Sequence, residues 1–390
     1  MLELLFWLAA GAVAYTWIGY PLLLAVLAAL APHSRRRPGP APRLSVIIAA
    51  FNEAHCIVAK IASTLGQRYP DDRLEVVVVS DGSTDGTDEI VLGHPDPRLT
   101  LVRQTPRAGK SPALNRGVAA ASGEILVFTD ANALFVPGTL ARLAAPFEDP
   151  RVGLVSGQGL YGAAGGADAR AVSNGYVRYE AWLKRGEGAL GFLASADGAV
   201  YALRRELYRP LDPAEVNDLL HPIQAALAGL ACRFDPEACT VEPPSRDASQ
   251  EFRRHVRIIA QGMHLCGRWL PRLVAAGRGR AVWALLSHRV LRWATGAFLA
   301  TAVVASAVLA ADAPFYRVML AAQGAFYGLA LAGLVAERRG VSLGRLAIPY
   351  YFCVVVAAGA AGFVRYLRGG AEATWAPGGR TPAAVRDRAA

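Results

Sequence analysis

The chain has 390 residues, a formal net charge of +10, 53% hydrophobic residues and only 18% charged residues. This composition is too apolar for a soluble protein of that length, so we expect membrane segments beside one sizeable domain. The five cysteines are scattered and form no CxxC pair, which argues against a disulfide framework. No zinc-finger spacing and no basic run interleaved with aromatic residues is present, so we expect membrane lipid rather than nucleic acid as the partner of the positive charge.

The first expected element is a transmembrane helix at residues 1–31. Leu2–Leu30 is nearly all apolar, with Glu3 as its one charge, and it is long enough to cross about 30 Å of hydrocarbon. A signal peptide is the alternative, but the basic residues at Arg35–Arg37 follow the apolar run instead of preceding it. The positive-inside rule then places the N-terminus outside and the next domain in the cytoplasm.

After a Pro-rich linker at Pro38–Pro42, apolar β-branched strands alternate with helices. This alternation predicts an α/β domain at residues 43–250, with a parallel sheet covered on both faces. Ligands of such sheets bind beyond the carboxyl ends of the strands. The expected strands are Leu44–Ala50, Leu74–Ser80, Leu99–Gln104 and Ile125–Thr129, and the expected helices are about Glu53–Gln67, Asp85–Gly93 and Pro112–Ala121.

Polar residues follow the first two strands directly. The loop at Asn52 and Glu53 can offer backbone groups and a carboxylate to a base or ribose, although Asn52 is also a good N-cap. Asp81 can accept hydrogen bonds from a base edge, whereas Ser83 and Asp85 are typical of a turn and a helix cap.

The next strand and the loop before it carry groups suited to a diphosphate and its cation. Asp130 and Asn132 stand at i and i+2 after the strand and offer the oxygen ligands that Mg²⁺ and Mn²⁺ prefer. Lys110, in the Gly-containing loop Arg107–Ser111, can neutralise a phosphate, but the spacing is not that of a Walker A loop.

The C-terminal half is predicted to lie at the membrane. An amphipathic basic helix is expected at residues 251–272, either on the membrane surface or as a solvated face, followed by transmembrane helices at 283–368 and a tail at 369–390. Four crossings with the N-terminus outside would leave the basic tail outside, against the positive-inside rule. Either one apolar segment is re-entrant or interfacial, or the N-terminal helix has the other orientation. The apolar segments are Trp283–Ala311, Pro314–Ala336 and Leu346–Leu367.

Taken together, the strand ends resemble glycosyltransferase family 2, whose catalytic domains have the GT-A fold, a Rossmann-like nucleotide-binding sheet. The membrane half, including Ser287–Trp293 and Trp375–Arg380, resembles bacterial members that build extracellular β-linked polysaccharides. The matching stretches are SVIIAAFNE (Ser45–Glu53), VVVVSDGSTDGT (Val76–Thr87), KSPALN (Lys110–Asn115), GEILVFTDAN (Gly123–Asn132), DGAVYALRRELY (Asp197–Tyr208), VNDLLHPI (Val216–Ile223) and QEFRRHVRIIAQG (Gln250–Gly262).

The resemblance implies a role for each matching residue. Asp218 is implied as the catalytic base, although Asn217 stands where the family has an acid. The family's DxD metal motif falls on Asp130 and Asn132, and the QxxRW motif of processive members falls on Gln250 and Arg253, with Arg254 in place of the Trp. Asp197 either contacts the acceptor or makes a turn. The residues implied for nucleotide-sugar binding are Ala50, Phe51, Glu53, Asp81, Lys110 and Asp130, and those for the acceptor or diphosphate are Asp197, Gln250, Arg253 and Arg254.

The implied activity is that of a metal-dependent, inverting hexosyl- or N-acetylhexosaminyltransferase. It would use a UDP-sugar donor and Mg²⁺ or Mn²⁺, at the bacterial inner membrane, with several crossings and the catalytic domain facing the cytoplasm. The acceptor would be a glycan in extracellular or capsular polysaccharide synthesis; a polyprenyl phosphate or lipid-linked glycan is the alternative. A non-catalytic nucleotide-binding scaffold is a third reading, against which Asp81, Asp130 and Asp218 all count.

Overall fold

The computed structural model describes residues 1–31, 41–162, 175–243, 248–341 and 344–369, and these form two compact units. The sheet unit comprises Leu27–Ala248 and Trp269–Val282. The apolar unit comprises Met1–Val26, Ser249–Arg268 and the described residues from Trp283 onward. Most of the expected linker, and the expected tail beyond residue 369 with Trp375–Arg380, lie outside the described residues.

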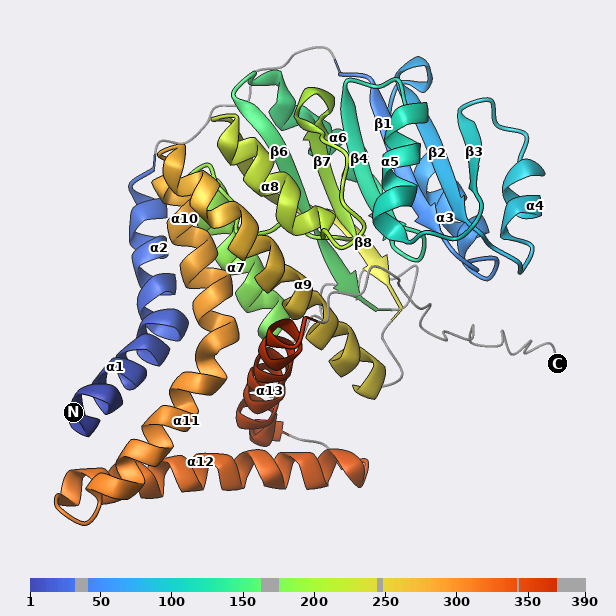
Figure 1. The fold of residues 1–390 in the computed structure, drawn as a ribbon. Coiled ribbons are helices and arrows are strands. Elements are labelled where there is room, and N and C mark those ends of the chain that lie inside the picture. Colours follow the sequence, from blue (N-terminus) through green and yellow to red (C-terminus); the bar gives the residue numbers. More distant parts are fainter. Residues whose placement is uncertain (32–40, 163–174, 244–247, 342–343, 370–390) are drawn as a thin grey trace. The chain divides into compact units, whose positions relative to one another are not determined.

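The sheet unit is built on one eight-stranded sheet with the order β3-β2-β1-β4-β7-β6-β8-β5 (Figure 1). The four strands predicted from sequence end within one residue of their expected bounds, and they are mutually parallel. The strands are β1 Leu44–Ala50, β2 Leu74–Asp81, β3 Leu99–Gln104, β4 Ile125–Asp130, β5 Leu134–Phe135, β6 Val152–Tyr161, β7 Val200–Arg204 and β8 Ala231–Glu242.

The second half of the sheet consists of strands that the sequence pattern does not predict. β7 runs antiparallel to both β4 and β6, and β5 runs antiparallel to β8, so the sheet is mixed. Antiparallel neighbours need no crossover helix, so this half lacks the regular strand–helix alternation on which the prediction rested. The result is a mixed sheet with parallel and antiparallel pairs.

Helices cover both faces of the parallel half, as expected. Val46 and Ile48 of β1 share a buried cluster with Ile57 of α3. On the opposite face Gly117 of α5 lies so close to β1 that an added Cβ would stand 2.6 Å from Ile47 Cγ2 (Figure 1). Because helices bury both faces of this half of the sheet, its polar groups can be presented only at the ends of the strands. The helices of the sheet unit are α3 Ile57–Leu65, α4 Thr87–Leu92, α5 Lys110–Ala120, α6 Thr139–Ala144, α7 Gly175–Ala189 and α8 Asn217–Leu227.

The apolar unit contains helices that are long and apolar enough to cross a membrane. Near the start of α1, Phe6 shares a buried cluster with Ala305 of α11 and Tyr316 of α12. Further along, the Tyr15 and Ser287 hydroxyls lie 2.8 Å apart, each inside a short π-helical turn. The four candidate spans among the described residues are Leu2–Ala29, Gly279–Leu309, Pro314–Arg338 and Gly344–Leu367. Their helices are α1 Leu2–Ala14, α2 Tyr20–Ala29, α10 Gly279–Ala284, α11 Leu291–Leu309, α12 Pro314–Arg338 and α13 Ala347–Leu367, with a π turn between α1 and α2 and another between α10 and α11.

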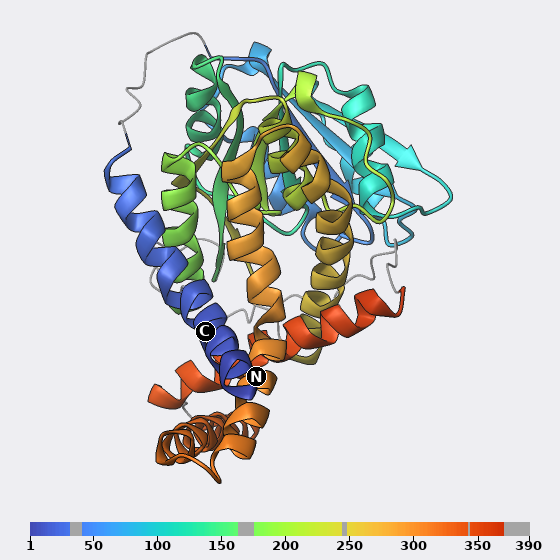
Figure 2. The same cartoon turned by 60° about the vertical axis from the view of Figure 1, so that its left-hand side comes forward.

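Within the apolar unit, α12 runs crosswise to α11 and α13 (Figures 1 and 2). α1 and α11 pack along one another, and α12 lies at the end of this pair that holds Phe6. The predicted amphipathic helix is α9, Ala248–Ala275, which is longer than expected and passes from the apolar unit into the sheet unit.

Candidate active site

Asp81, at the end of β2, organises the loop that carries Lys110. Its Oδ1 accepts hydrogen bonds from Gln104 Nε2 (2.6 Å) and the Ala108 amide (2.8 Å), and its Oδ2 accepts one from the Gly109 amide (2.8 Å). The Asp81 side chain is 4% exposed, and Arg107 Nε lies 3.7 Å from Oδ2. This buried carboxylate therefore fixes the path of residues 107–109 and the start of α5.

The loops after β1 and β2 are clamped together by short polar side chains. Ser83 Oγ accepts a hydrogen bond from the Asn52 amide (3.1 Å), and Thr87 Oγ1 accepts one from the Glu53 amide (2.9 Å). Asn52 adopts a left-handed backbone conformation, with φ of 55°. The clamp explains why α3 begins at Ile57 and not near Glu53 as predicted: residues 52–56 are a turn tied to the neighbouring loop.

Phe51 lies beside the Asp81 loop. The Arg107 guanidinium stands 3.6 Å above the centre of the Phe51 ring, a cation–π contact between the loops that follow β1 and β3. Ala50, the last residue of β1, is buried under this pair of loops. The structure thus gathers Ala50, Phe51 and Asp81 at one edge of the sheet.

Asp130, at the end of β4, faces Lys110. Lys110 Nζ donates to Asp130 Oδ1 at 2.5 Å, and both side chains are partly exposed. Asn132 follows in the turn after β4 and is also partly exposed. The predicted phosphate-binding lysine and the predicted metal-binding carboxylate therefore meet.

Lys60 contacts the chain on both sides of the Asp130 turn, and the sequence did not predict it as a site residue. Its Nζ is fully buried and donates to Thr129 Oγ1 (2.7 Å) and to the Ala133 carbonyl, on either side of the Asp130 turn. Desolvation lowers the pKa of Lys60 to about 7, against the opposing attraction of Asp130. A lysine within the otherwise apolar run IVAKIA is the signal that could have identified it.

Asp218 opens α8, and its backbone is tied to the loop before β7. Pro222, four residues later, has no N–H to donate to the Asp218 carbonyl. That carbonyl instead accepts a hydrogen bond from the Ala196 amide at 2.8 Å. The carboxylate lies against Gly198, where an added Cβ would stand 2.9 Å from Asp218 Oδ2.

A buried polar chain holds Asn217, the neighbour of Asp218. Asn217 Nδ2 donates to the Tyr201 hydroxyl at 2.6 Å, and that hydroxyl lies 2.9 Å from His221 Nδ1. Burial lowers the pKa of His221 to about 3, so the imidazole is neutral at physiological pH. An amide at position 217 can be buried against this tyrosine without the cost of burying a charge.

Strand β7 brings Asp218 and Asp130 to the same edge. Thr129 pairs with Val200 across the antiparallel β4–β7 ladder, so the next residue, Asp130, stands beside the Gly198 turn that Asp218 contacts. Burial raises the pKa of Tyr201, and the negative charges of Asp218 and Asp130 both add to this rise.

Asp197 makes the turn that leads into β7. Its Oδ2 accepts a hydrogen bond from the Gly159 amide (3.0 Å), its Oδ1 accepts one from the Ala199 amide (3.2 Å), and Lys184 Nζ lies 3.6 Å away. Of the two readings of this residue, the turn is thus seen directly; an acceptor contact stays a proposal.

The remaining predicted residues belong to the apolar unit. Gln250, Arg253 and Arg254 lie in the first turns of α9, and the Gln250 side chain is outside the described part of the chain. Asp81, Lys110, Asp130 and Asp218 all belong to the sheet unit.

We expect Gly198→Ala to lower kcat by about 10- to 100-fold, because the new Cβ displaces the Asp218 carboxylate. The backbone of Gly198 does not have a positive φ, so the fold accepts alanine there. The matched control is Gly175→Ala, where an added Cβ meets no atom within 4 Å. Steady-state kinetics beside a melting curve make the comparison; equal loss of kcat in both variants would contradict this role for Gly198.

Comparison with protein families finds a match over much of the sheet unit. The sequence model described as Glycosyl transferase family 2 matches residues 45–209, which run from β1 past β7. The chain carries a glycosyltransferase family 2 domain. The expected family and the expected GT-A fold are both confirmed.

Two curated proteins are similar to parts of this chain. The chain is 27% identical over 261 residues to the probable glycosyltransferase YdaM of Bacillus subtilis, covering 63% of this chain and 61% of the relative. It is 32% identical over 145 residues to a beta-monoglucosyldiacylglycerol synthase of Nostoc, covering 36% and 31%. It thus spans less than two thirds of the length of these relatives.

A solved structure is similar to most of this chain. The mannosyltransferase PcManGT from Pyrobaculum calidifontis, in complex with GDP-Man and Mn²⁺, superposes with a TM-score of 0.70 at 28% identity. The match covers 94% of this chain and 99% of the other. The likeness therefore extends beyond the family 2 domain.

Proposed function

We propose that this glycosyltransferase transfers a sugar from a nucleoside-diphosphate donor, with inversion, to an acceptor at the cytoplasmic face of a membrane. The observation that supports the proposal is the gathering of polar groups at one edge of the sheet. Asp81 holds the loop before Lys110, Lys110 pairs with Asp130 at the end of β4, and Asp218 lies against Gly198 just before β7, the strand that pairs with β4. These groups offer what the parts of a nucleotide sugar need: a nucleoside loop, a cation for phosphate, an acid for a metal, and a base.

The nucleoside would lie against the loops after β1 and β2. Phe51 and Arg107 offer an apolar ring and a planar cation to a base, and Glu53 offers a carboxylate to the ribose. The sequence pattern points to a UDP-sugar, and the Pyrobaculum mannosyltransferase, solved with GDP-Man, supports testing a GDP-sugar beside it.

A divalent cation fits the turn after β4. Asp130 and Asn132 provide a carboxylate and an amide, both hard oxygen ligands of the kind that Mg²⁺ and Mn²⁺ prefer. When bound, the metal would stabilise the negative charge of the departing diphosphate. Lys110, now paired with Asp130, stands where its ammonium group can also contact a phosphate.

Asp218 would act as the base in this proposal. It takes the proton from the acceptor hydroxyl while the hydroxyl oxygen attacks the anomeric carbon from the side opposite the nucleotide. One such displacement inverts the configuration, and it needs one base rather than the carboxylate pair of a retaining hydrolase. The Gly198 contact and the Asn217–Tyr201 hydrogen bond hold that base in place.

The arrangement of the apolar unit favours three crossings. Because α12 runs crosswise to α11 and α13, we propose that it lies along the outer membrane face instead of spanning. The chain would then cross with α1–α2, α10–α11 and α13, from an external N-terminus to an internal C-terminal end. Arg365 and Arg368 would face the cytoplasm, which satisfies the positive-inside rule that four crossings violate.

Two acceptor classes are compatible with a membrane-embedded transferase. The sequence pattern of the membrane half favours a growing polysaccharide. The Nostoc relative, named as a glycolipid synthase, favours a lipid acceptor as the second candidate.

A donor panel tests the proposal. The full chain in lipid nanodiscs would be given radiolabelled UDP-glucose, UDP-N-acetylglucosamine and GDP-mannose with lipid extract or oligosaccharide, with nucleotide release and product partition measured. We expect one donor to release nucleotide and to label a product, polymeric for the first candidate and lipid-extractable for the second. Release from none of a full range of nucleotide sugars would support the scaffold reading instead.

Removal of divalent cations is expected to stop transfer. Loss of a metal that supplies several kcal/mol of charge stabilisation lowers the rate by at least about 10²-fold, since each 1.4 kcal/mol is worth roughly tenfold. Activity in EDTA, followed by titration with Mg²⁺ or Mn²⁺, provides the measurement. Full activity in EDTA would show that Lys110, without a metal, stabilises the negative charge of the departing diphosphate.

A further inference from the structure

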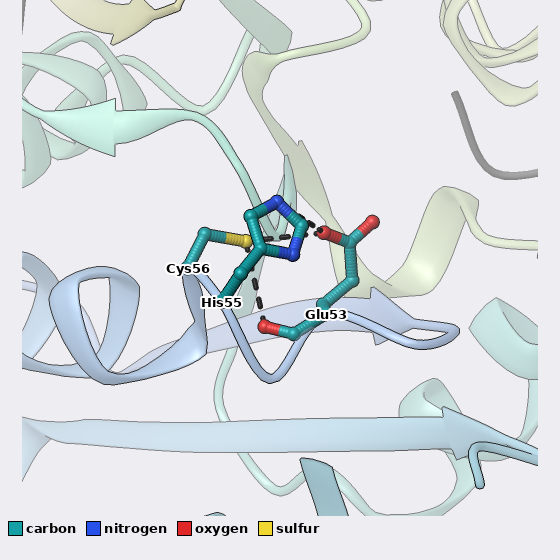
Figure 3. Close-up of side chains that lie close together, drawn as sticks. All are labelled: Glu53, His55 and Cys56. Carbon is teal, nitrogen blue, oxygen red and sulfur yellow. Dashed lines mark hydrogen bonds and ion pairs between the residues drawn. The ribbon is translucent and has the colours of Figure 1, made fainter. Parts of the chain in front are cut away.

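Three metal-ligating side chains of different chemistry converge in the turn between β1 and α3. Glu53, His55 and Cys56 each offer one ligand atom, and these atoms all lie within 4.8 Å of one another (Figure 3). Cys56 Sγ stands 3.1 Å from Glu53 Oε2, and His55 Nε2 stands 3.9 Å from the same oxygen.

The backbone holds this convergence. The Cys56 amide donates to the Glu53 carbonyl at 3.0 Å, which closes the turn. The Glu53 amide is held by Thr87 Oγ1, so the turn is fixed to the loop after β2 as well. His55 is exposed, and Glu53 and Cys56 are partly exposed, so a cation can enter from solvent.

The separations fit a small thiophilic cation. Zinc bonds of about 2.3 Å to sulfur and about 2.0–2.1 Å to nitrogen or oxygen place tetrahedral ligand atoms roughly 3.3–3.6 Å apart. The two measured separations, 3.1 and 3.9 Å, bracket this range, and rotation of the exposed His55 ring can close the rest. A thiolate, an imidazole and a carboxylate suit Zn²⁺, whereas Asp130 and Asn132 suit Mg²⁺ or Mn²⁺.

The triad also lies against the turn proposed for the donor's metal. Cys56 Sγ is 3.6 Å from the carbonyl of Ala131, the residue between Asp130 and Asn132. Glu53 is itself proposed to contact the nucleoside. A cation bound by the triad would therefore engage Glu53 and sit between the nucleoside loop and the Asp130 turn.

We propose that Glu53, His55 and Cys56 form a second metal site, which takes Zn²⁺ or a similar thiophilic cation and, when filled, excludes the nucleotide sugar. On binding, the Cys56 thiol loses its proton to solvent and forms one sulfur–metal bond; a water molecule completes the coordination. The exclusion of the nucleotide sugar rests on the proposed function, whereas metal binding by these three residues does not.

Cobalt spectroscopy tests metal binding at this site without any transferase assay. Co²⁺ titrated into the full chain in detergent should give a near-ultraviolet thiolate-to-cobalt charge-transfer band that Zn²⁺ bleaches. Cys56→Ser should abolish the band. His55→Gln should weaken Co²⁺ affinity by at least roughly 10- to 100-fold, which is the usual loss when even an outer-shell partner of a metal ligand is removed. Cys353→Ser is the matched control and Asp130→Asn the test of independence; both should retain the band. A band absent from the wild type, or unchanged in Cys56→Ser, overturns the site.

Inhibition by Zn²⁺ tests whether the filled metal site excludes the nucleotide sugar. Zn²⁺ should inhibit transfer at saturating Mn²⁺, and Cys56→Ser should raise the inhibitory concentration by about tenfold or more while transferring normally without zinc. Equal zinc sensitivity in both proteins would overturn the exclusion. A chain that binds cobalt but transfers no sugar from any donor would instead count against the proposed function.

Discussion

Asp218→Asn is expected to lower kcat by about 10²- to 10⁴-fold or more, the usual contribution of a general base, while the donor still binds. Asparagine keeps the shape of the side chain against Gly198 and leaves the Ala196–Asp218 backbone hydrogen bond intact. What disappears is the ability to take the acceptor's proton. Single-turnover transfer and donor affinity, measured on the same preparation, separate the two quantities.

The matched control is Asp72→Asn, which removes an exposed carboxylate elsewhere in the sheet unit. It should behave as wild type in both measurements. A variant of Asp218 that transfers sugar at the normal rate would remove the base from the proposal. One that loses donor binding in equal measure would show that Asp218 holds the donor instead.

Asp81→Asn is expected to weaken donor binding more than it slows chemistry. The carboxylate accepts three hydrogen bonds, and an amide nitrogen in place of one oxygen faces the Gly109 or Ala108 N–H. Loss of a hydrogen bond to a charged group costs about 1.5–3 kcal/mol. The dissociation constant of the nucleoside diphosphate should therefore rise by about 10- to 100-fold, as measured by calorimetry.

Gln104→Leu is the graded control for Asp81, because it removes one of the three donors and spares both backbone amides. Its effect on affinity should be smaller than that of Asp81→Asn. If Gln104→Leu weakens binding as much as Asp81→Asn does, the backbone contacts to the 107–109 loop are not what Asp81 contributes.

The parallel half of the sheet was predictable because its strands are apolar on both faces and separated by helices. β1 to β4 follow that pattern, and the side chains placed at their ends do meet: Asp81 fixes the loop of Lys110, and Lys110 pairs with Asp130. The strands from β5 to β8 do not follow that pattern, so the ladder between β4 and β7 was not foreseen.

The buried residues that contact and position the site residues were the hardest to predict from sequence. Lys60 is a lysine inside an apolar helix, and Tyr201 is an ordinary strand residue until the hydrogen bond to Asn217 is seen. Gly198 matters because the Asp218 carboxylate, distant in the chain, lies against it. In each case the role depends on a contact distant in sequence, which local patterns do not encode.

The most direct test of the whole account is a structure of the full chain with Mn²⁺ and a donor analogue that cannot transfer its sugar. The account predicts the diphosphate and metal at Asp130 and Lys110, the base beside Phe51 and the Asp81 loop, and the Asp218 carboxylate facing the anomeric carbon from the side away from the nucleotide. A donor bound with its anomeric carbon out of reach of Asp218 would contradict it.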